Sequence, residues 1–293
     1  MLISPPFGGA RAPVLARNTV ASSQPLATQA GIEALQNGGN AVDAALATAI
    51  TLTVVEPTMN GLGGDGFAIV WDGKQIHGLN ASGRAPAAWT PEYFDGKTAM
   101  DLIGWNTVTV PGMVSGWVEL SKKFGKLPFA QLFKRAIDYA ENGFPVSPVI
   151  ARQWREAIPI LKNQPGFAES FLIDGKAPQA GQIWRFPAQA KTLQELAATQ
   201  GESFYKGALA QSMVDFAQSS GGCFTMRDFA DNKPDWVEPL AFDYGDYTLL
   251  EIPPNGSGIA AQMALGILQA ANVKQYPANS AQRIHLQIEA MRL

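Results

Sequence analysis

The sequence is poor in the residues that build disulfides, metal sites and nucleic-acid-binding surfaces. Its 293 residues include one cysteine, Cys223, and two histidines, His77 and His285. A single cysteine excludes an internal disulfide and a cysteine-rich metal cluster, and two histidines argue against a histidine-built metal site. Only 16% of the residues are charged, and the formal net charge of -3 lacks the basic excess of a nucleic-acid-binding protein. We therefore expect no metal, no cofactor and no nucleic acid partner.

Apolar runs of membrane-spanning length are also missing. The most apolar segment, residues 41–55, carries Asp43 and several threonines and is shorter than the ~20 residues that a membrane crossing requires. Residues 1–11 have no basic start followed by an uninterrupted apolar stretch, which argues against a secretory signal. We therefore expect a cytoplasmic protein with no membrane contact. A chain from which a signal had been removed would look the same unless Met1 is the true start.

Hydrophobic residues make up 46% of the chain, which is enough for a sizeable core in one large domain or two modest ones. Their spacing and the glycine, proline and asparagine end signals predict many helices and a few strands. The predicted helices span residues 25–36, 41–55, 111–124, 128–141, 149–161, 188–198, 208–218, 259–271 and 281–293. The predicted strands cover residues 67–71 and 75–79, which form a hairpin, and residues 247–252.

Two helix starts carry side chains suited to capping. Asn40 can cap the helix at 41–55, and Thr225 with Asp228 resembles a capping box. Because the 41–55 helix is apolar on nearly every side, we expect other layers of the fold to enclose it.

Residues 61–66 formally satisfy the G-x-G-x-x-G pattern of a dinucleotide-binding turn. That turn must follow a strand and open a helix, whereas here a helix precedes the glycines and a strand follows them. We interpret the run as a corner that needs close backbone approach and positive φ. His77, in the second strand of the hairpin, is interpreted as a structural or surface residue, and Cys223 as a small buried side chain.

Arg84 is the candidate for binding a substrate. It lies between Gly83 and Ala85-Pro86, just past the hairpin, on a loop that the proline makes rigid. A guanidinium presents a fixed fork that matches a carboxylate with two hydrogen bonds. From residue type alone, a surface or ion-paired arginine is the better interpretation, with Asp65 and Asp43 as candidate partners.

Groups of residues in order along the chain resemble successive landmarks of the γ-glutamyltransferase (γ-glutamyltranspeptidase) family, and they cover roughly residues 19–293. They are SQPLA at 23–27, GGNAVDAA at 38–45, GGDGF at 63–67, GRAP at 83–86, VPG at 110–112, GG at 221–222 with Thr225 and Asp228, and PP at 253–254 with SG at 257–258. One such group would be weak evidence, but the ordered set is specific.

The resemblance implies an α+β fold, the four-layer αββα sandwich of N-terminal-nucleophile hydrolases, made as a precursor that cleaves itself. The nucleophile is then the new N-terminal threonine of the small subunit, usually followed by Thr-His, and this sequence does not contain it. Residues 1–293 would therefore be a single domain, the large subunit of a heterodimer, incomplete as a catalyst without the small subunit. A dimer of heterodimers stays open.

In such an enzyme the threonine attacks an amide carbonyl and an acyl-enzyme forms. The resemblance puts the oxyanion donors on the small subunit, so we expect no catalytic residue on this chain. It implies that Arg84 binds the carboxylate of the substrate.

The loop around Arg84 departs from the transpeptidase pattern, in which Arg-Glu-x-Ala-Pro follows an acidic or aromatic residue. Here Ser82-Gly83 precede Arg84 and Ala85-Pro86 follow it directly, and Asn255-Gly256 stand where transpeptidases tend to carry serines. This version resembles the amidohydrolase side of the family. We expect hydrolysis of oxamate to oxalate and ammonia. The alternatives are a γ-glutamyl hydrolase or transpeptidase, a cephalosporin-acylase-like amidase, and a non-enzymatic module that binds an anion.

Overall fold

The computed structural model describes residues 14–292, and it begins with the predicted helix-to-helix corner. α1 (Pro25–Gln36) is followed by α2 (Ala41–Val55), as the sequence predicts. The Asn40 side chain accepts hydrogen bonds from the N–H groups of Val42 and Asp43, and Asp43 accepts one from the N–H of Asn40. This reciprocal cap pairs donors that the start of a helix otherwise leaves free.

α2 is enclosed by its neighbours, which confirms the prediction from its apolar composition. Asp43 is completely buried (0% exposed) and also accepts hydrogen bonds from the N–H groups of Lys126 (3.0 Å) and Leu127 (3.3 Å). One carboxylate thus joins the start of α2 to the loop after a later helix. The buried residues of α2 are Asp43, Ala44, Leu46, Ala47, Thr48, Ile50, Thr51, Thr53, Val54 and Val55.

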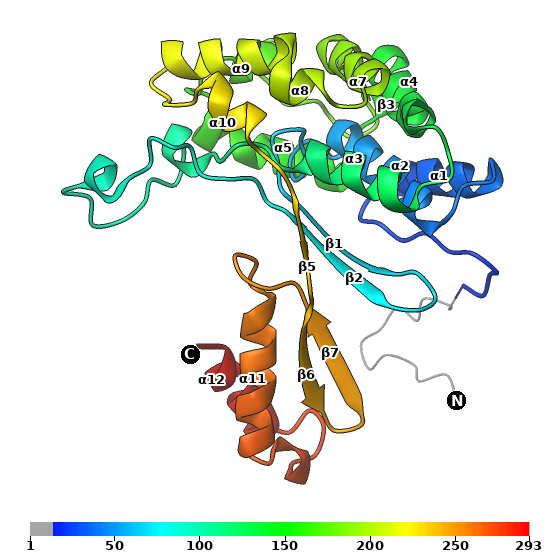
Figure 1. The fold of residues 1–293 in the computed structure, drawn as a ribbon, viewed down its shortest axis with the longest axis vertical. Coiled ribbons are helices and arrows are strands. Elements are labelled where there is room, and N and C mark those ends of the chain that lie inside the picture. The colour runs from blue at the N-terminus through cyan, green and yellow to red at the C-terminus, as the bar shows by residue number, and fades with distance from the viewer. Residues whose placement is uncertain (1–13, 293) are drawn as a thin grey trace.

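A layer of helices extends from this corner and shares one apolar core (Figure 1). The helices are α3 (Met113–Phe124), α4 (Lys134–Asn142), α5 (Pro148–Leu161), α6 (Phe167–Phe171), α7 (Pro187–Thr199), α8 (Ser203–Lys206), α9 (Ala208–Ser219) and α10 (Met226–Ala230). The 3-10 turns η1 (Pro91–Phe94) and η2 (Trp105–Thr107) precede α3, η3 (Phe129–Phe133) lies between α3 and α4, and η4 (Val273–Gln275) comes later in the chain. The helix predicted at 128–141 is in fact η3 followed by α4, and Phe133 at their junction is fully buried.

Within residues 14–292 the strands form three small antiparallel sheets. β1 (Gly66–Trp71), β2 (Ile76–Ala81) and β5 (Asp235–Val237) make the largest, in the order β1-β2-β5. The register pairs Gly66 with Ala81 and Asn80 with Asp235. Two-stranded sheets are formed by β3 (Phe144–Pro145) with β4 (Ile183–Trp184), and by β6 (Leu240–Tyr244) with β7 (Tyr247–Glu251).

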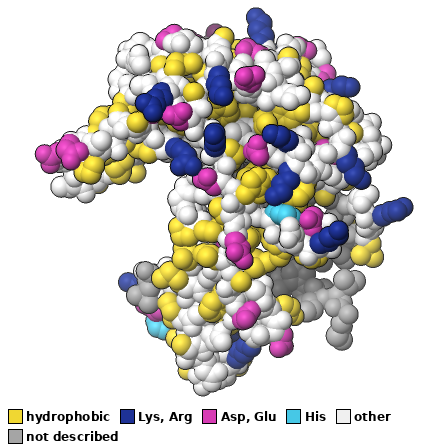
Figure 2. All heavy atoms as spheres, viewed as in Figure 1, with side chains coloured by type: hydrophobic (Ala, Val, Ile, Leu, Met, Phe, Trp, Pro, Cys, Tyr) yellow, Lys and Arg dark blue, Asp and Glu magenta, His cyan; other side chains and the backbone are white. Residues whose placement is uncertain are grey.

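The two faces of the β1-β2-β5 sheet have different surroundings. Leu79 and Ala81 are buried (1% and 2% exposed) on the face that α3 covers. On the opposite face of β1, Phe67, Ile69 and Trp71 are 44%, 45% and 63% exposed. Figure 2 shows hydrophobic side chains gathered where the helical body meets the part of the chain that contains β6 and β7. Such a contiguous apolar face is typical of a surface that another layer covers.

The last part of the chain packs α11 (Gly258–Ala270) and α12 (Ala281–Arg292) beside the β6-β7 hairpin (Figure 1). Its small apolar cluster contains Ala264, Leu268, Val273 and Ala290. Helices and separate antiparallel sheets together confirm the predicted α+β class. Among residues 14–292 no helix has the length and apolar composition of a membrane span. Residues 1–11, where a secretory signal was judged absent, lie outside the described residues.

Replacing Asp43 by Ala should lower the free energy of unfolding by about 3 kcal/mol, because several buried N–H groups would lose their acceptor. Denaturant unfolding of the full protein measures this change. Asp246→Ala, in the exposed turn between β6 and β7, is the matched control and should have little effect. Equal stability of the two variants would contradict this role of Asp43.

Candidate functional site

Arg84 is held by a close crossing of two backbone segments. Gly83 has a φ of +82°, and a Cβ atom added there would overlap the carbonyl oxygen of Val110. A Cβ atom added at Gly112 would likewise overlap the carbonyl oxygen of Ala81. The N–H of Val110 donates to the carbonyl oxygen of Arg84 (2.9 Å). Only glycine fits both crossing positions, so the sequence fixes the backbone of Arg84 directly after β2.

The side chain of Arg84 pairs with Asp235, the first residue of β5. Its Nη2 atom donates to both oxygens of Asp235, at 3.2 and 3.1 Å. The two side chains are 58% and 61% exposed. The predicted partners are wrong: Asp43 is buried against backbone N–H groups. Asp235 takes their place because the β2-β5 register brings it beside Asn80, four residues before Arg84.

A ring of hydrogen bonds joins the Arg84 loop to the loop between β7 and α11. The Asn255 side chain accepts from Asn80 Nδ2 (2.9 Å) and donates to Ser82 Oγ (2.9 Å). The N–H of Ser82 donates to Asn80 Oδ1 (3.0 Å), which closes the ring. Ser82 is buried, at 8% exposure. The end of β2 is therefore attached to the last part of the chain immediately before Arg84.

Asp228 fixes the other side of the same loop. It accepts hydrogen bonds from the N–H of Ala87 (2.8 Å) and from the N–H (2.8 Å) and hydroxyl (2.7 Å) of Thr225. The predicted capping box of Thr225 and Asp228 is confirmed at the start of α10. Partial burial opposes ionisation, but these hydrogen bonds lower the pKa of Asp228 below its usual value of 3.8. This contact therefore stabilises the fold above pH 3.8, and the stabilisation is lost as the pH falls through the lower folded-state pKa.

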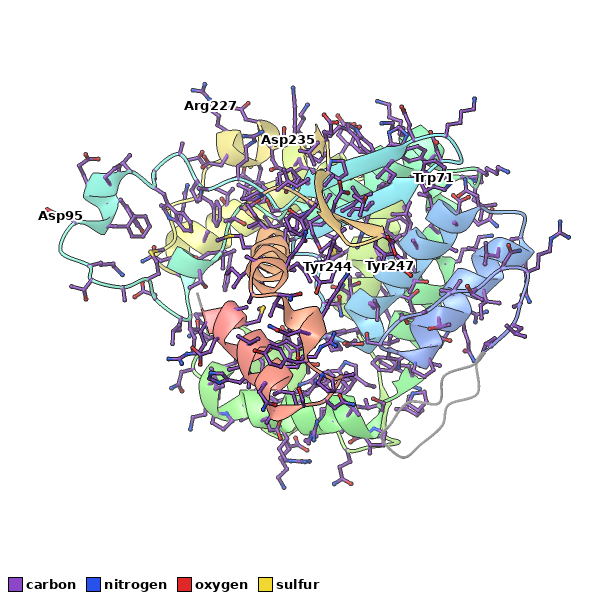
Figure 3. The ribbon with its side chains drawn as sticks, turned by 90° about the horizontal axis from the view of Figure 1, so that it is seen from below. Trp71, Asp95, Arg227, Asp235, Tyr244 and Tyr247 are labelled. Atoms are coloured by element: carbon purple, nitrogen blue, oxygen red, sulfur yellow. The ribbon has the colours of Figure 1, made fainter. Side chains whose placement is uncertain are left out.

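The loops around Arg84 can bind a carboxylate, and nothing in their described contacts pairs a nucleophile with a base. Asp65 lies at the same end of the hairpin, directly before Gly66, and burial raises the pKa of its carboxyl. Figure 3 shows Asp235 at β5, far in that view from Asp95 in the protruding segment after the Arg84 loop. Among residues 14–292 no group of three or more His, Cys, Asp or Glu residues could hold a metal ion.

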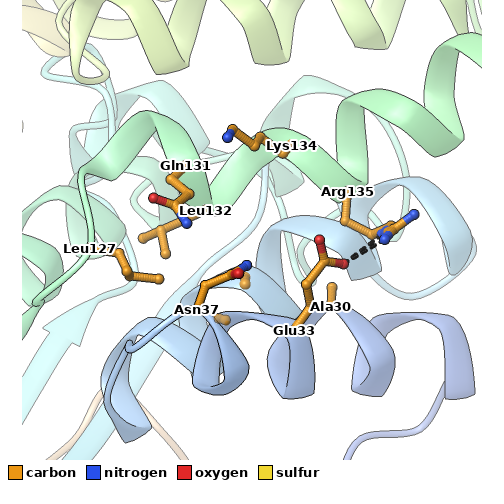
Figure 4. Close-up of a pocket in the computed structure, with 10 residues that line it drawn as sticks. Ala30, Glu33, Asn37, Leu127, Gln131, Leu132, Lys134 and Arg135 are labelled. Atoms are coloured by element: carbon orange, nitrogen blue, oxygen red, sulfur yellow. Dashed lines mark hydrogen bonds and ion pairs between the residues drawn. The ribbon is translucent and has the colours of Figure 1, made fainter.

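A small cavity between α1 and α4 is not the site (Figure 4). Its volume is 20 Å³, enough for about one water molecule. Its wall includes the ion pair between Arg135 Nη2 and Glu33 (2.6 Å). Arg84 does not line it.

Three other interpretations of the sequence have clear outcomes. His77 lies in β2 and contacts Asp72 (2.8 Å) and Lys123 (3.4 Å), which is consistent with the structural interpretation. Cys223 is half-buried rather than buried, because its loop lies at the surface beside α9. The glycine run is a corner between α2 and β1 where Gly64 closely approaches Met113, but its glycines do not have positive φ.

Asp235 and the Asn80–Ser82 part of the ring were missed by the sequence analysis. β5 is three residues long, too short for a periodic signal, and it is separated from Arg84 by some 150 residues. Asn255 stands in the proline loop where transpeptidases tend to carry serines. This departure is the one sequence signal that points to the ring.

Comparison with known proteins gives consistent matches along the chain. Residues 27–293 match the family described as gamma-glutamyltranspeptidase. A glutathione hydrolase-like proenzyme of Bacillus subtilis is 37% identical over 279 residues, covering 94% of this chain and 53% of that relative. The oxamate amidohydrolase proenzyme of Klebsiella pneumoniae is 37% identical over 273 residues, covering 90% and 51%. The cephalosporin acylase from Bacillus halodurans has a TM-score of 0.86 at 43% identity, covering 98% of this chain and 56% of that chain. The chain spans about half the length of the curated relatives it matches.

Replacing Gly83 by Ala should destabilise the protein by about 2 kcal/mol or more, because the new methyl group meets the Val110 carbonyl. Gly73→Ala is the matched control: φ there is +95°, but nothing lies within 4 Å of the added Cβ. Thermal unfolding of both variants measures the difference. If Gly83→Ala were no more harmful than Gly73→Ala, the crossing would not restrict this loop.

Proposed function

Because the chain belongs to the γ-glutamyltranspeptidase family, we propose that it is the large-subunit portion of an N-terminal-nucleophile amidohydrolase. The proposed reaction is hydrolysis of the amide of a small substrate that carries a carboxylate. Arg84 carries this proposal, since its guanidinium is exposed to solvent while its backbone is fixed on both sides. Fixed backbone and an accessible fork are what recognition of a carboxylate requires.

The bond is broken by a companion chain in this proposal. The hydroxyl oxygen of an N-terminal threonine on the small subunit attacks the amide carbonyl, and its own α-amino group takes the proton. Expulsion of the amine leaves an acyl ester on the threonine, which water then hydrolyses. Arg84 holds the substrate carboxylate through both steps and fixes the distance from the carbonyl to the threonine.

The exposed face of β1 is the surface we assign to the small subunit. Phe67, Ile69 and Trp71 point away from α3 and form an apolar strip on the β1-β2-β5 sheet. Two observations favour the rest of the same precursor as the occupant: the chain spans about half of its relatives, and those relatives are named proenzymes. We thus propose residues 1–293 as one domain of a self-cleaved zymogen. Whether two heterodimers associate further can be read from the native mass.

Oxamate is the leading substrate. The Gly-Arg-Ala-Pro version of the Arg84 loop, which lacks the transpeptidase glutamate, supports it, as does the likeness to the Klebsiella amidohydrolase. A γ-glutamyl compound is the second candidate, supported by the glutathione hydrolase-like relative, and an acylase substrate is the third, supported by the Bacillus halodurans acylase.

Ammonia release from oxamate is the direct test, run on the full, self-processed protein beside a γ-glutamyl anilide and an acyl β-lactam. The proposal predicts turnover of oxamate with the highest kcat/KM of the three. A higher kcat/KM for the anilide than for oxamate would favour a γ-glutamyl compound, the second candidate, as the substrate. Turnover of the β-lactam alone would contradict a small substrate, and oxalate binding without any turnover would indicate a non-enzymatic anion-binding module.

Arg84→Lys keeps the positive charge and loses the two-nitrogen fork. We predict that KM rises by a factor corresponding to about 2 kcal/mol, roughly thirtyfold, with a smaller change in kcat. Steady-state kinetics with the preferred substrate measures both constants. Arg135→Lys, at the ion pair beside the small cavity, is the control and should leave KM unchanged. An unchanged KM in Arg84→Lys would remove Arg84 from the site.

A further inference from the structure

The ion pair between Arg84 and Asp235 engages a single nitrogen of the guanidinium. Both oxygens of Asp235 lie on Nη2 alone, at 3.2 and 3.1 Å. An arginine binds a carboxylate most strongly when two nitrogens each donate to one oxygen, at about 2.7–2.9 Å. Nη2 belongs to both of the two-nitrogen edges of a guanidinium. A second carboxylate that forms a fork on Arg84 therefore shares Nη2 with Asp235, whose negative charge then lies close to it.

The position of Asp235 is fixed by the pairing of β5 with β2. It begins β5, and its backbone pairs with Asn80 in the middle strand of the sheet. Its neighbour Trp236 pairs with the buried Leu79, and the Lys123 ammonium lies 3.7 Å from the Trp236 ring centre. The Asp235 carboxylate is therefore held at the edge of the site, within hydrogen-bond distance of the Arg84 guanidinium.

Resting on the proposed role of Arg84, we propose that Asp235 is a positioning residue that acts through Arg84 and sets the affinity for the substrate carboxylate. Asp235 lies on Nη2, and the substrate carboxylate shares that nitrogen with it. Each binding event then brings two carboxylates close to one guanidinium. The pair is a weak competitor, because both side chains are about 60% exposed and water screens their attraction.

The charge of Asp235 is tested by Asp235→Asn, which keeps the size and an acceptor oxygen but removes the negative charge. The prediction is a KM about two- to fivefold lower for the preferred substrate, with kcat unchanged, since only an exposed ion pair is lost. Asp235→Ala should also lower KM. The decrease should shrink at high salt, which screens the wild-type pair. A merely structural residue would not lower KM on replacement.

Two controls separate this inference from the function on which it rests. Asp138→Asn removes an exposed carboxylate that pairs with Arg135 at 3.2 Å, away from the Arg84 loop, and should leave KM unchanged. Arg84→Ala should raise KM strongly, and if it does not, the role of Arg84 fails and this inference with it. If Arg84→Ala raises KM while Asp235→Asn and Asp235→Ala raise it or leave it unchanged, Arg84 binds the substrate but Asp235 does not compete with it.

Discussion

The close crossing of the Gly83 and Gly112 segments is the constraint on which the candidate site depends. Each glycine faces a carbonyl oxygen at a distance that excludes any side chain. The crossing holds the end of β2 against the residues that precede α3, so the relative positions of the hairpin, α3 and the Arg84 loop are fixed together. A side chain whose backbone is fixed in this way can be exposed to solvent and still start from a well-defined position.

The regular elements could largely be predicted from the sequence because their signals are local. The caps at Asn40 and Thr225 and the hairpin after the glycine run follow from neighbouring residues, and the structure has them. The sequence predicts one helix at 128–141 because the apolar spacing continues across Phe133, where the structure changes from the 3-10 turn η3 to α4. The family resemblance and the fold class are confirmed by the matches along the chain.

The partners of Arg84 could not be predicted in the same way. An exposed ion pair costs and gains little free energy, so residue type does not determine which carboxylate an arginine meets. Asp235 reaches Arg84 through the pairing of β5 with β2, and Asn255 reaches Ser82 from a loop more than 170 residues away. Both contacts depend on the fold of the whole chain. Arg84 itself was found from the glycine and proline that flank it and from the ordered family motifs.

The central claim is that substrate binding and amide cleavage belong to two different chains. Arg84 binds the carboxylate of the substrate, and a threonine on the companion chain cleaves the amide. A crystal structure of the full, processed protein with bound oxalate, and a second one with bound glutamate, tests this most directly. The account predicts that a carboxylate of one of these ligands accepts two hydrogen bonds from Arg84 and that an N-terminal threonine lies beside the ligand. A ligand bound away from Arg84, or a site without such a threonine, would contradict it.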